Sequence, residues 1–223
     1  MDKVFNKLLL IDGSFMIHRA LHIPEFFDMI SPLGVRNGGI YGFLKILGSE
    51  LKISGNYFPI VVFDDGLNPR RTEIYPDYKK RKSKKNESVM TKEESDDEYI
   101  EQYHVQRNQV AIILSYLGIP VIRFKDNEGD DLLAILSRLA KESIVLTDDK
   151  DMLQLLSENC KVRRPMANEL WDYDAFVKDK EFSDIYDFII YKAVMGDSSD
   201  NIPKSCNGVG DKSINYFIKL IYI

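Results

Sequence analysis

Residues 7–14 read KLLLIDGS, a continuous apolar run closed by a carboxylate, a glycine and a serine. The helix-like FMIHRAL follows at 15–21, so this stretch predicts a buried strand that leads directly into a helix. The same design recurs as FPIVVFDD at 58–65, PVIRF at 120–124 and SIVLTDD at 143–149. Helical patterns fall between these segments, at 39–53, about 98–117, 130–142 and 150–156. The alternation predicts an α/β fold built on a doubly wound, mostly parallel sheet.

The pattern changes after residue 156. The segments KVRRP (161–165) and ELWDY (169–173) predict a small hairpin or edge strands, and the apolar spacing of 183–195 suits a helix. The tail then breaks at GDSSDNIP and GVG before a last helical run at 211–222. We therefore expect an α/β core over residues 1–182 and a helical appendage over 183–223.

Composition and charge limit the classes of function. The 223 residues are 44% hydrophobic and 29% charged, as in ordinary soluble globular proteins. The 30 Lys and Arg against 35 Asp and Glu give a formal charge of −5, so any contact with nucleic acid requires a local basic patch. No apolar run approaches the ~20 residues of a membrane span, and no long apolar run follows the N-terminal charges, so we expect neither a membrane span nor a secretory signal. We expect a cytosolic protein without membrane contact, in which Cys160 and Cys206 are plain thiols.

Carboxylates follow every predicted strand. Ligands bind beyond the carboxyl ends of strands in open parallel sheets, so these side chains should share one edge. A single acid at a strand end is commonly a helix N-cap, but capping alone does not account for acids at the ends of four strands. The acids are Asp12, Asp64, Asp65, Glu128, Asp130, Asp131, Asp148, Asp149 and Asp151.

So many carboxylates at one edge would repel one another unless cations neutralise them. Oxygen ligands favour Mg²⁺ or Mn²⁺ over Zn²⁺, and the three histidines form no cluster; His18 and His22 share a helix face, where packing or surface roles are expected. Asp197 and Asp200 in the tail are either part of a Ser/Asp-rich loop or a second acidic group at the same edge. In the second case two metals can lie about 3.5–4 Å apart, an arrangement that supports phosphodiester cleavage.

Two further segments suggest phosphate contacts. Residues 79–85, KKRKSKK, hold six Lys or Arg after Arg70 and Arg71, and are either a solvated or targeting segment or a grip on a phosphate backbone. A glycine-containing turn opens the last predicted helix and is either only a loop or a phosphate contact. Its glycines permit close backbone approach, and N–H groups at the helix start can hold phosphate. Its residues are Gly208, Gly210, Lys212 and Ser213.

The ordered set LLLIDGS, VVFDD, RR with YPDYKK, EGDD, TDDKDMLQL, GDSSDNIP and GVGDKS resembles the 5′ nuclease superfamily. It is most similar to bacteriophage flap endonucleases and 5′-3′ exonucleases, including the phage ribonuclease H type, and to the nuclease domain of bacterial DNA polymerase I. The resemblance implies a PIN-like core, a helical arch at about 79–103, and a helix-three-turn-helix DNA-binding appendage, here apparently shortened. Lys204 to Asn207 depart from the pattern of that family.

The resemblance also implies roles for individual residues. Two Mg²⁺ or Mn²⁺ ions would be held by Asp12, Asp64, Glu128, Asp130, Asp131, Asp149, Asp151, Asp197 and Asp200, the first four serving one ion and the last four the other. Asp65 and Asp148 match no ligand and are expected to support or cap. Lys79 and Arg19 match catalytic phosphate-binding residues, although surface ion pairing is the alternative for Arg19. Tyr78 matches a DNA-stacking residue, and a second cationic role stays open between Arg81 and Lys82. A monovalent cation such as K⁺ is implied at the Gly208–Gly210 hairpin.

These features predict a metal-dependent, structure-specific 5′ nuclease acting on branched or 5′-ended DNA and on RNA primers. We expect a monomer with a replication-protein partner. One alternative is a branched-DNA-binding module that has lost its chemistry, and another is a PIN-type ribonuclease, which needs neither the arch nor the glycine hairpin. A dehalogenase-fold phosphatase needs Asp-x-Asp on its first strand, and Asp12-Gly13-Ser14 lacks the second acid.

Overall fold

The computed structural model describes residues 5–80, 90–180 and 182–210, together with 213, 214, 216 and 218. Side chains of residues 90–97 are outside this description. Three residues expected to bind DNA, Arg81, Lys82 and Lys212, therefore lie outside the described residues, as does most of the last helical run predicted at 211–222.

One six-stranded sheet forms the centre of the molecule, in the order β3-β2-β1-β4-β5-β6. Its strands are β1 (Phe5–Asp12), β2 (Phe58–Val62), β3 (Val121–Ile122), β4 (Ala140–Leu146), β5 (Cys160–Arg164) and β6 (Glu169–Trp171). Neighbouring strands are parallel except for β5 and β6, which pair antiparallel at one edge. The prediction of a mostly parallel α/β sheet is confirmed, and the two segments after residue 156 form its edge.

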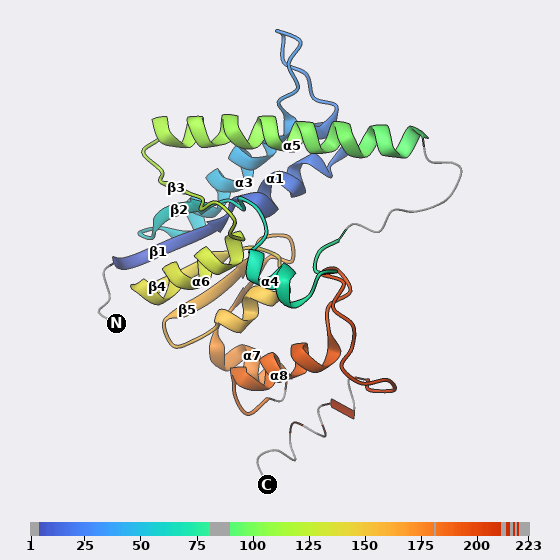
Figure 1. Cartoon of the computed structure of the whole chain (residues 1–223). Coiled ribbons are helices and arrows are strands. Elements are labelled where there is room, and N and C mark those ends of the chain that lie inside the picture. The colour runs from blue at the N-terminus through green and yellow to red at the C-terminus, as the bar shows by residue number, and fades with distance from the viewer. Residues whose placement is uncertain are drawn as a thin grey trace.

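Helices cover both faces of the sheet (Figure 1). One face carries α1 (Gly13–Leu21), α3 (Gly38–Ser54) and the long α5 (Met90–Tyr116). The other carries α6 (Gly129–Leu139), the 3₁₀ helix η1 (Lys150–Leu155), α7 (Tyr173–Lys180) and α8 (Ile185–Met195). Side chains alternate along β1, so that Leu9 and Ile11 pack under the first layer and Leu8 and Leu10 under the second. Two short helices, α2 (Pro24–Phe27) and α4 (Pro69–Ile74), complete the description.

Three element boundaries differ from the sequence prediction. The helix expected at 130–142 ends at Leu139, and β4 begins at Ala140 because this residue pairs with Phe5 on the neighbouring strand. The segment after Asp149 is a 3₁₀ helix, and β3 has only two residues. Local periodicity predicted the type of most elements, but pairing with β1 decided where β4 starts.

Gly13 allows the first helix to begin directly at the sheet edge. A Cβ atom at this position would lie 2.5 Å from the ring of Phe63. A side chain at this position would therefore force α1 or the Phe63 ring to move. Because Asp12 is the N-cap of α1, the absence of a side chain at residue 13 keeps the Asp12 carboxylate at the end of β1.

The second helix layer includes α8, whose Phe188 belongs to the same buried cluster as Phe176 of α7 and Met152 of η1. Beyond α8, Ile214 and Ile218 are buried. The division at residue 182 and the helix-three-turn-helix topology stay predictions. No helix in the described part of the chain combines the length and apolarity that crossing a bilayer requires.

Candidate metal and phosphate site

The carboxyl ends of the central strands bring four carboxylates to one edge. Asp12 accepts hydrogen bonds from the Phe15 amide at 2.9 Å and from the Thr147 hydroxyl at 2.8 Å, which ties the end of β1 to the end of β4. Asp64, just beyond β2, accepts a bond from the Gly129 amide at the start of α6. The remaining members are Asp130 in the first turn of α6 and Asp149, the N-cap of η1.

These four carboxylates influence one another electrostatically. Burial, together with the charges of Asp12, Asp149 and Asp64, raises the pKa of Asp130 to about 8. Burial likewise raises the pKa of Asp12 to about 7, with smaller contributions from Asp64 and Asp149. Within the described part of the chain none of the four forms an ion pair. The N-cap role predicted as the alternative for a single acid is real for Asp12, but it does not neutralise the group.

A second set of carboxylates is already paired with cations. The Glu128 carboxylate accepts hydrogen bonds from the Lys79 ammonium and the Arg71 guanidinium, each at 2.5 Å, and from the Tyr78 hydroxyl at 2.9 Å. Burial alone would raise the pKa of Glu128, but the bonds from Lys79 and Arg71 outweigh it and lower the pKa. Arg71 also bonds Asp131 at 2.7 Å.

On the opposite side of the edge, Lys192 of α8 joins two carboxylates predicted as ligands. Its ammonium lies 2.8 Å from Asp151 and 2.8 Å from Asp197. Burial would raise the pKa of Asp197, but hydrogen bonds from Lys192 and Ser199 hold it well below the usual range. No sequence motif indicated Lys192, since a lysine in an apolar helix is usually a solvated residue.

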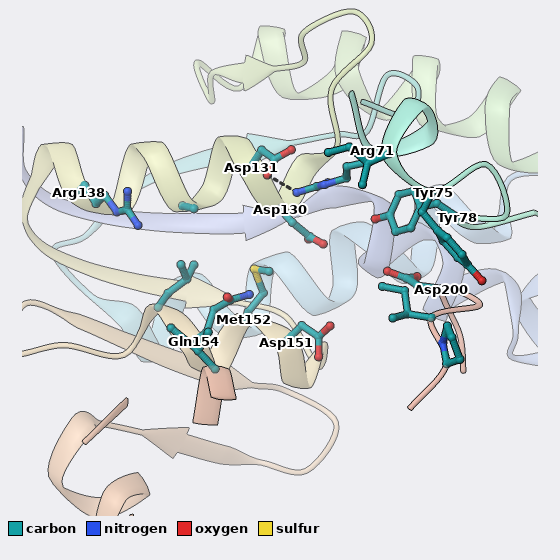
Figure 2. A pocket seen from close by; sticks show the side chains of 16 residues that line it. Arg71, Tyr75, Tyr78, Asp130, Asp131, Arg138, Asp151, Met152, Gln154 and Asp200 are labelled. Carbon is teal, nitrogen blue, oxygen red and sulfur yellow. Dashed lines mark hydrogen bonds and ion pairs between the residues drawn. The ribbon is translucent and has the colours of Figure 1, made fainter. Parts of the chain in front are cut away.

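A cavity of about 560 Å³ opens beside these groups (Figure 2). Asp130 and Asp131 line it from α6, with Asp131 turned toward Arg71. Asp151 lines it from η1 and Asp200 from the loop after α8. Apolar side chains such as Met152 form much of the remaining wall. Predicted ligands from three parts of the chain thus border one space.

The residues present fit a hard divalent cation. All donors are carboxylate oxygens, the central four lack cationic partners in the described part of the chain, and the buried Oδ2 of Asp131 has no hydrogen-bond partner there. Within the same residues, no three acidic, His or Cys side chains converge as a finished metal-binding group. Arg71, Lys79 and Lys192 neutralise four other carboxylates, those of Glu128, Asp131, Asp151 and Asp197.

Asn201, which was not among the predicted site residues, connects the segment after α4 to the loop after α8. Its side-chain amide donates to the backbone carbonyls of Asp77 and Lys80 at 3.1 and 2.6 Å, and its backbone carbonyl accepts from the Tyr75 hydroxyl at 3.0 Å. The Lys79 amide completes the contact by donating to the Asp200 carbonyl. Asn201 has φ 61°, a left-handed conformation that Asn tolerates. An asparagine, a residue common in turns, directly after Asp200 is the sequence signal that could have indicated the role of Asn201.

Several other predicted residues form no hydrogen bond or ion pair with the four central carboxylates in the described part of the chain, or serve structural roles. Arg19 donates from Nε to the Met166 sulfur, and Arg70 is exposed at the start of α4. Asp148 accepts a bond from the Met166 amide, and Asp65 makes backbone bonds to Asn127 and Asp126, as expected of supporting positions. His18 stacks on Tyr103 with ring centroids 4.1 Å apart, so packing is its role.

The glycine turn is built as a helix start. Gly208 has φ +80°, and the hydroxyl of Ser213 bonds both the amide and the carbonyl of Gly210. The Lys204 ammonium donates to the Val209 carbonyl at 3.2 Å. The family resemblance implies a monovalent cation at this turn. The Lys204 ammonium already contacts one carbonyl of the turn.

Residues 7–184 match the family described as 5′-3′ exonuclease, N-terminal resolvase-like domain. The chain belongs to the 5′-3′ exonuclease family. A 5′-3′ exonuclease of Aquifex aeolicus is 31% identical over 222 residues, which are 95% of this chain and 68% of that protein. DNA polymerase I of Streptococcus pneumoniae is 32% identical over 228 residues, covering 96% of this chain but only 23% of the polymerase.

Two solved structures share the fold. The bacteriophage T5 5′-exonuclease with bound zinc superposes with a TM-score of 0.76 at 22% identity, covering 96% of this chain and 75% of the other. Flap endonuclease-1 from Methanococcus jannaschii gives a TM-score of 0.56 at 19% identity, with coverages of 96% and 71%. Family membership and fold together confirm the resemblance to PIN-like 5′ nucleases. The individual ligand and DNA-binding assignments stay predictions.

Proposed function

We propose that this protein is a divalent-metal-dependent, structure-specific 5′ nuclease that hydrolyses phosphodiesters of branched or 5′-ended DNA. The observation that carries the proposal is the group Asp12, Asp64, Asp130 and Asp149. The first three are half-buried and the last is exposed, their charges repel one another, and they lack cationic partners among the described residues. Such a group is costly unless it holds cations. Family membership supplies the reaction class.

Two Mg²⁺ or Mn²⁺ ions are the proposed cofactors. One would bind to Asp12, Asp64, Glu128 and Asp130, the other to Asp149, Asp151, Asp197 and Asp200, with Asp131 beside the first. When bound, such ions lower the pKa of water and neutralise charge on a phosphate. The T5 5′-exonuclease neighbour carries bound zinc, which supports a divalent cation in this fold.

Basic side chains next to these carboxylates are the proposed phosphate contacts. Lys79 is held at the edge by Glu128 at 2.5 Å and lies 3.8 Å from Asp200. In our proposal its ammonium turns to the scissile phosphate and offsets charge as the transition state develops. Arg71 can shift in the same way from Glu128 and Asp131, and Arg19 is a phosphate contact further along the substrate.

The wider DNA contacts follow from the family resemblance. We assign the arch to residues about 79–103, base stacking to Tyr78, and backbone contacts to Arg70, Arg81 or Lys82 and the Gly208–Ser213 turn, with K⁺ as a candidate ion there. In the structure Tyr78 is nearly buried against Glu128, so stacking requires it to turn out. RNA–DNA hybrids as substrates, a monomeric state, a replication-protein partner and a cytoplasmic location belong to the same proposal.

A cleavage panel tests the function. The protein is incubated with 5′-flap, nicked, blunt and RNA-primed DNA and with single-stranded RNA, in Mg²⁺ and in excess chelator. We expect cleavage of flap and nicked DNA that leaves 5′-phosphate and 3′-hydroxyl ends and stops in chelator. Tight flap binding without cleavage in Mg²⁺ or Mn²⁺ would identify a binding module instead. Preferential cleavage of single-stranded RNA would identify a PIN-type ribonuclease.

A further inference from the structure

Lys192 is placed where a second cation is expected, and neither the family resemblance nor the proposed mechanism uses it. It lies in the last turn of α8, and its ammonium contacts Asp151 on η1 and Asp197 in the following loop, both at 2.8 Å. Its side chain is 30% exposed, as is that of Asp151, while that of Asp197 is 18% exposed. The ammonium thus bridges two carboxylates at the border of the protein and solvent.

Both carboxylates are held by their own elements. Gly196 ends α8 with φ +67°, and a Cβ there would lie 2.5 Å from the Pro203 carbonyl oxygen, so the turn closes tightly after the helix. Asp197 and Ile202 exchange backbone hydrogen bonds of 2.8 and 2.7 Å across that turn. On the other side, the Asp151 amide bonds Asp149 at 2.8 Å. The gap between the two carboxylates is therefore set by the fold and spanned by the lysine.

We propose that Lys192 is a resident counter-ion, which bridges Asp151 and Asp197 in the metal-free protein and leaves them when a divalent cation binds. The proposal rests on the proposed function, because these aspartates serve there as metal ligands. An ammonium and a divalent cation require the same oxygens, and together they repel each other, so they exclude each other at this position. Lysine suits the exchange because its flexible stem lets the head move into adjacent solvent.

This role has two measurable consequences. Without metal, Lys192 relieves the repulsion between Asp151 and Asp197 and holds the loop after α8 against η1, so its removal should destabilise the metal-free protein. With metal, the displaced ammonium still opposes the charge of the ion. Both effects weaken metal binding, so a neutral side chain at residue 192 should strengthen it.

Metal binding without DNA is the test. Wild-type protein, Lys192→Met and Lys192→Gln are freed of metal and titrated with Mn²⁺ by calorimetry. We expect the dissociation constant of one site to tighten by about tenfold in both variants, the order expected when one nearby unit charge is removed from a partly exposed site. In chelator their melting temperatures should fall, and the rise on adding Mn²⁺ should exceed that of the wild type. The Gln variant retains a polar side chain, so the test stands if Met prevents folding.

Two controls separate this role from others. Lys150 is exposed, lies next to Asp149 and Asp151 in sequence, and makes no ion pair in the described part of the chain. Lys150→Met should therefore change the Mn²⁺ dissociation constant much less. Lys192→Arg keeps the charge and should not tighten Mn²⁺ binding. Equal or weaker Mn²⁺ binding by the neutral variants would overturn the inference alone. Lack of saturable Mn²⁺ binding by the wild type would overturn the proposed function and the inference with it.

Discussion

Asp130, a proposed metal ligand, should also make the free energy of unfolding depend on pH. Burial, with help from Asp12, Asp149 and Asp64, raises its pKa to about 8, whereas an unfolded chain would give it a value of about 3.9. Between these values the folded protein binds a proton that the unfolded chain has released, so the free energy of unfolding falls as pH rises from about 4 to about 8. Asp12, with a pKa of about 7, acts in the same direction over most of that range.

Removing this charge should therefore stabilise the metal-free protein. In chelator at pH 8, Asp130→Asn is expected to raise the free energy of unfolding by about 1–3 kcal/mol relative to wild type, and the difference should vanish near pH 4. Urea denaturation at several pH values measures both. Glu158→Gln, at an exposed turn, is the control and should change neither. A wild-type stability that rises steadily from pH 5 to 8 in chelator would contradict the assignment.

Lys79 and Lys80 are adjacent lysines in different environments. Lys79 bonds Glu128, whereas Lys80 pairs with exposed Asp77 and is itself 65% exposed. Lys79→Ala should lower the single-turnover cleavage rate by about 100-fold or more with a modest change in DNA affinity. Lys80→Ala should weaken binding slightly and reduce the salt dependence by about one phosphate contact. If both variants lost the same cleavage rate and recovered it at saturating DNA, Lys79 would be removed from the catalytic residues.

Two chain segments far apart in sequence are joined by Asn201, and this contact positions Lys79. Asn201→Gly deletes the side-chain bonds to Asp77 and Lys80 but keeps the left-handed backbone accessible. We expect faster hydrogen exchange at the Lys79 amide, which bonds Asp200 across this contact, and a reduced cleavage rate.

Asn168→Gly is the matched control. Asn168 also has positive φ, at 53°, and bonds Arg163 away from the carboxylates. This change should reduce stability without altering exchange at Lys79. If Asn201→Gly left that exchange unchanged, the contact would have no part in holding Lys79.

At the scale of the whole molecule, the proposed metal ligands come from the core strands, from α6 and from the loop after α8, so activity should depend on hard cations. Mg²⁺ or Mn²⁺ should support cleavage, whereas Ca²⁺, with larger and looser coordination, should permit DNA binding with little cleavage. Cleavage rates and DNA affinities measured in each ion, on chelator-treated protein, test this. Full activity in excess chelator would exclude the metal mechanism.

The sequence alone indicated where strands end and which acids follow them, because strand type and turn chemistry are local properties. KLLLIDGS predicted a strand, a cap and a helix, and the structure has β1, Asp12 as the N-cap and α1 at those positions. The ordered motifs also indicated the family. Carboxylates at the ends of parallel strands were expected to share an edge, so the four members of the central group were among the nine acids predicted there. That Glu128 pairs with cations while Asp149 does not, among the residues that the structure describes, was not predictable from spacing.

Only the tertiary structure decided which cation meets which carboxylate. Asn201 contacts Asp77 across 124 residues and Arg71 meets Glu128 across 57, and no periodicity relates such positions. The start of β4 at Ala140 likewise depends on hydrogen bonds to β1, which outweigh the helical pattern of that segment. Sequence spacing reports interactions within a few residues, whereas charge pairing and strand pairing depend on distances that exist only after the chain has folded.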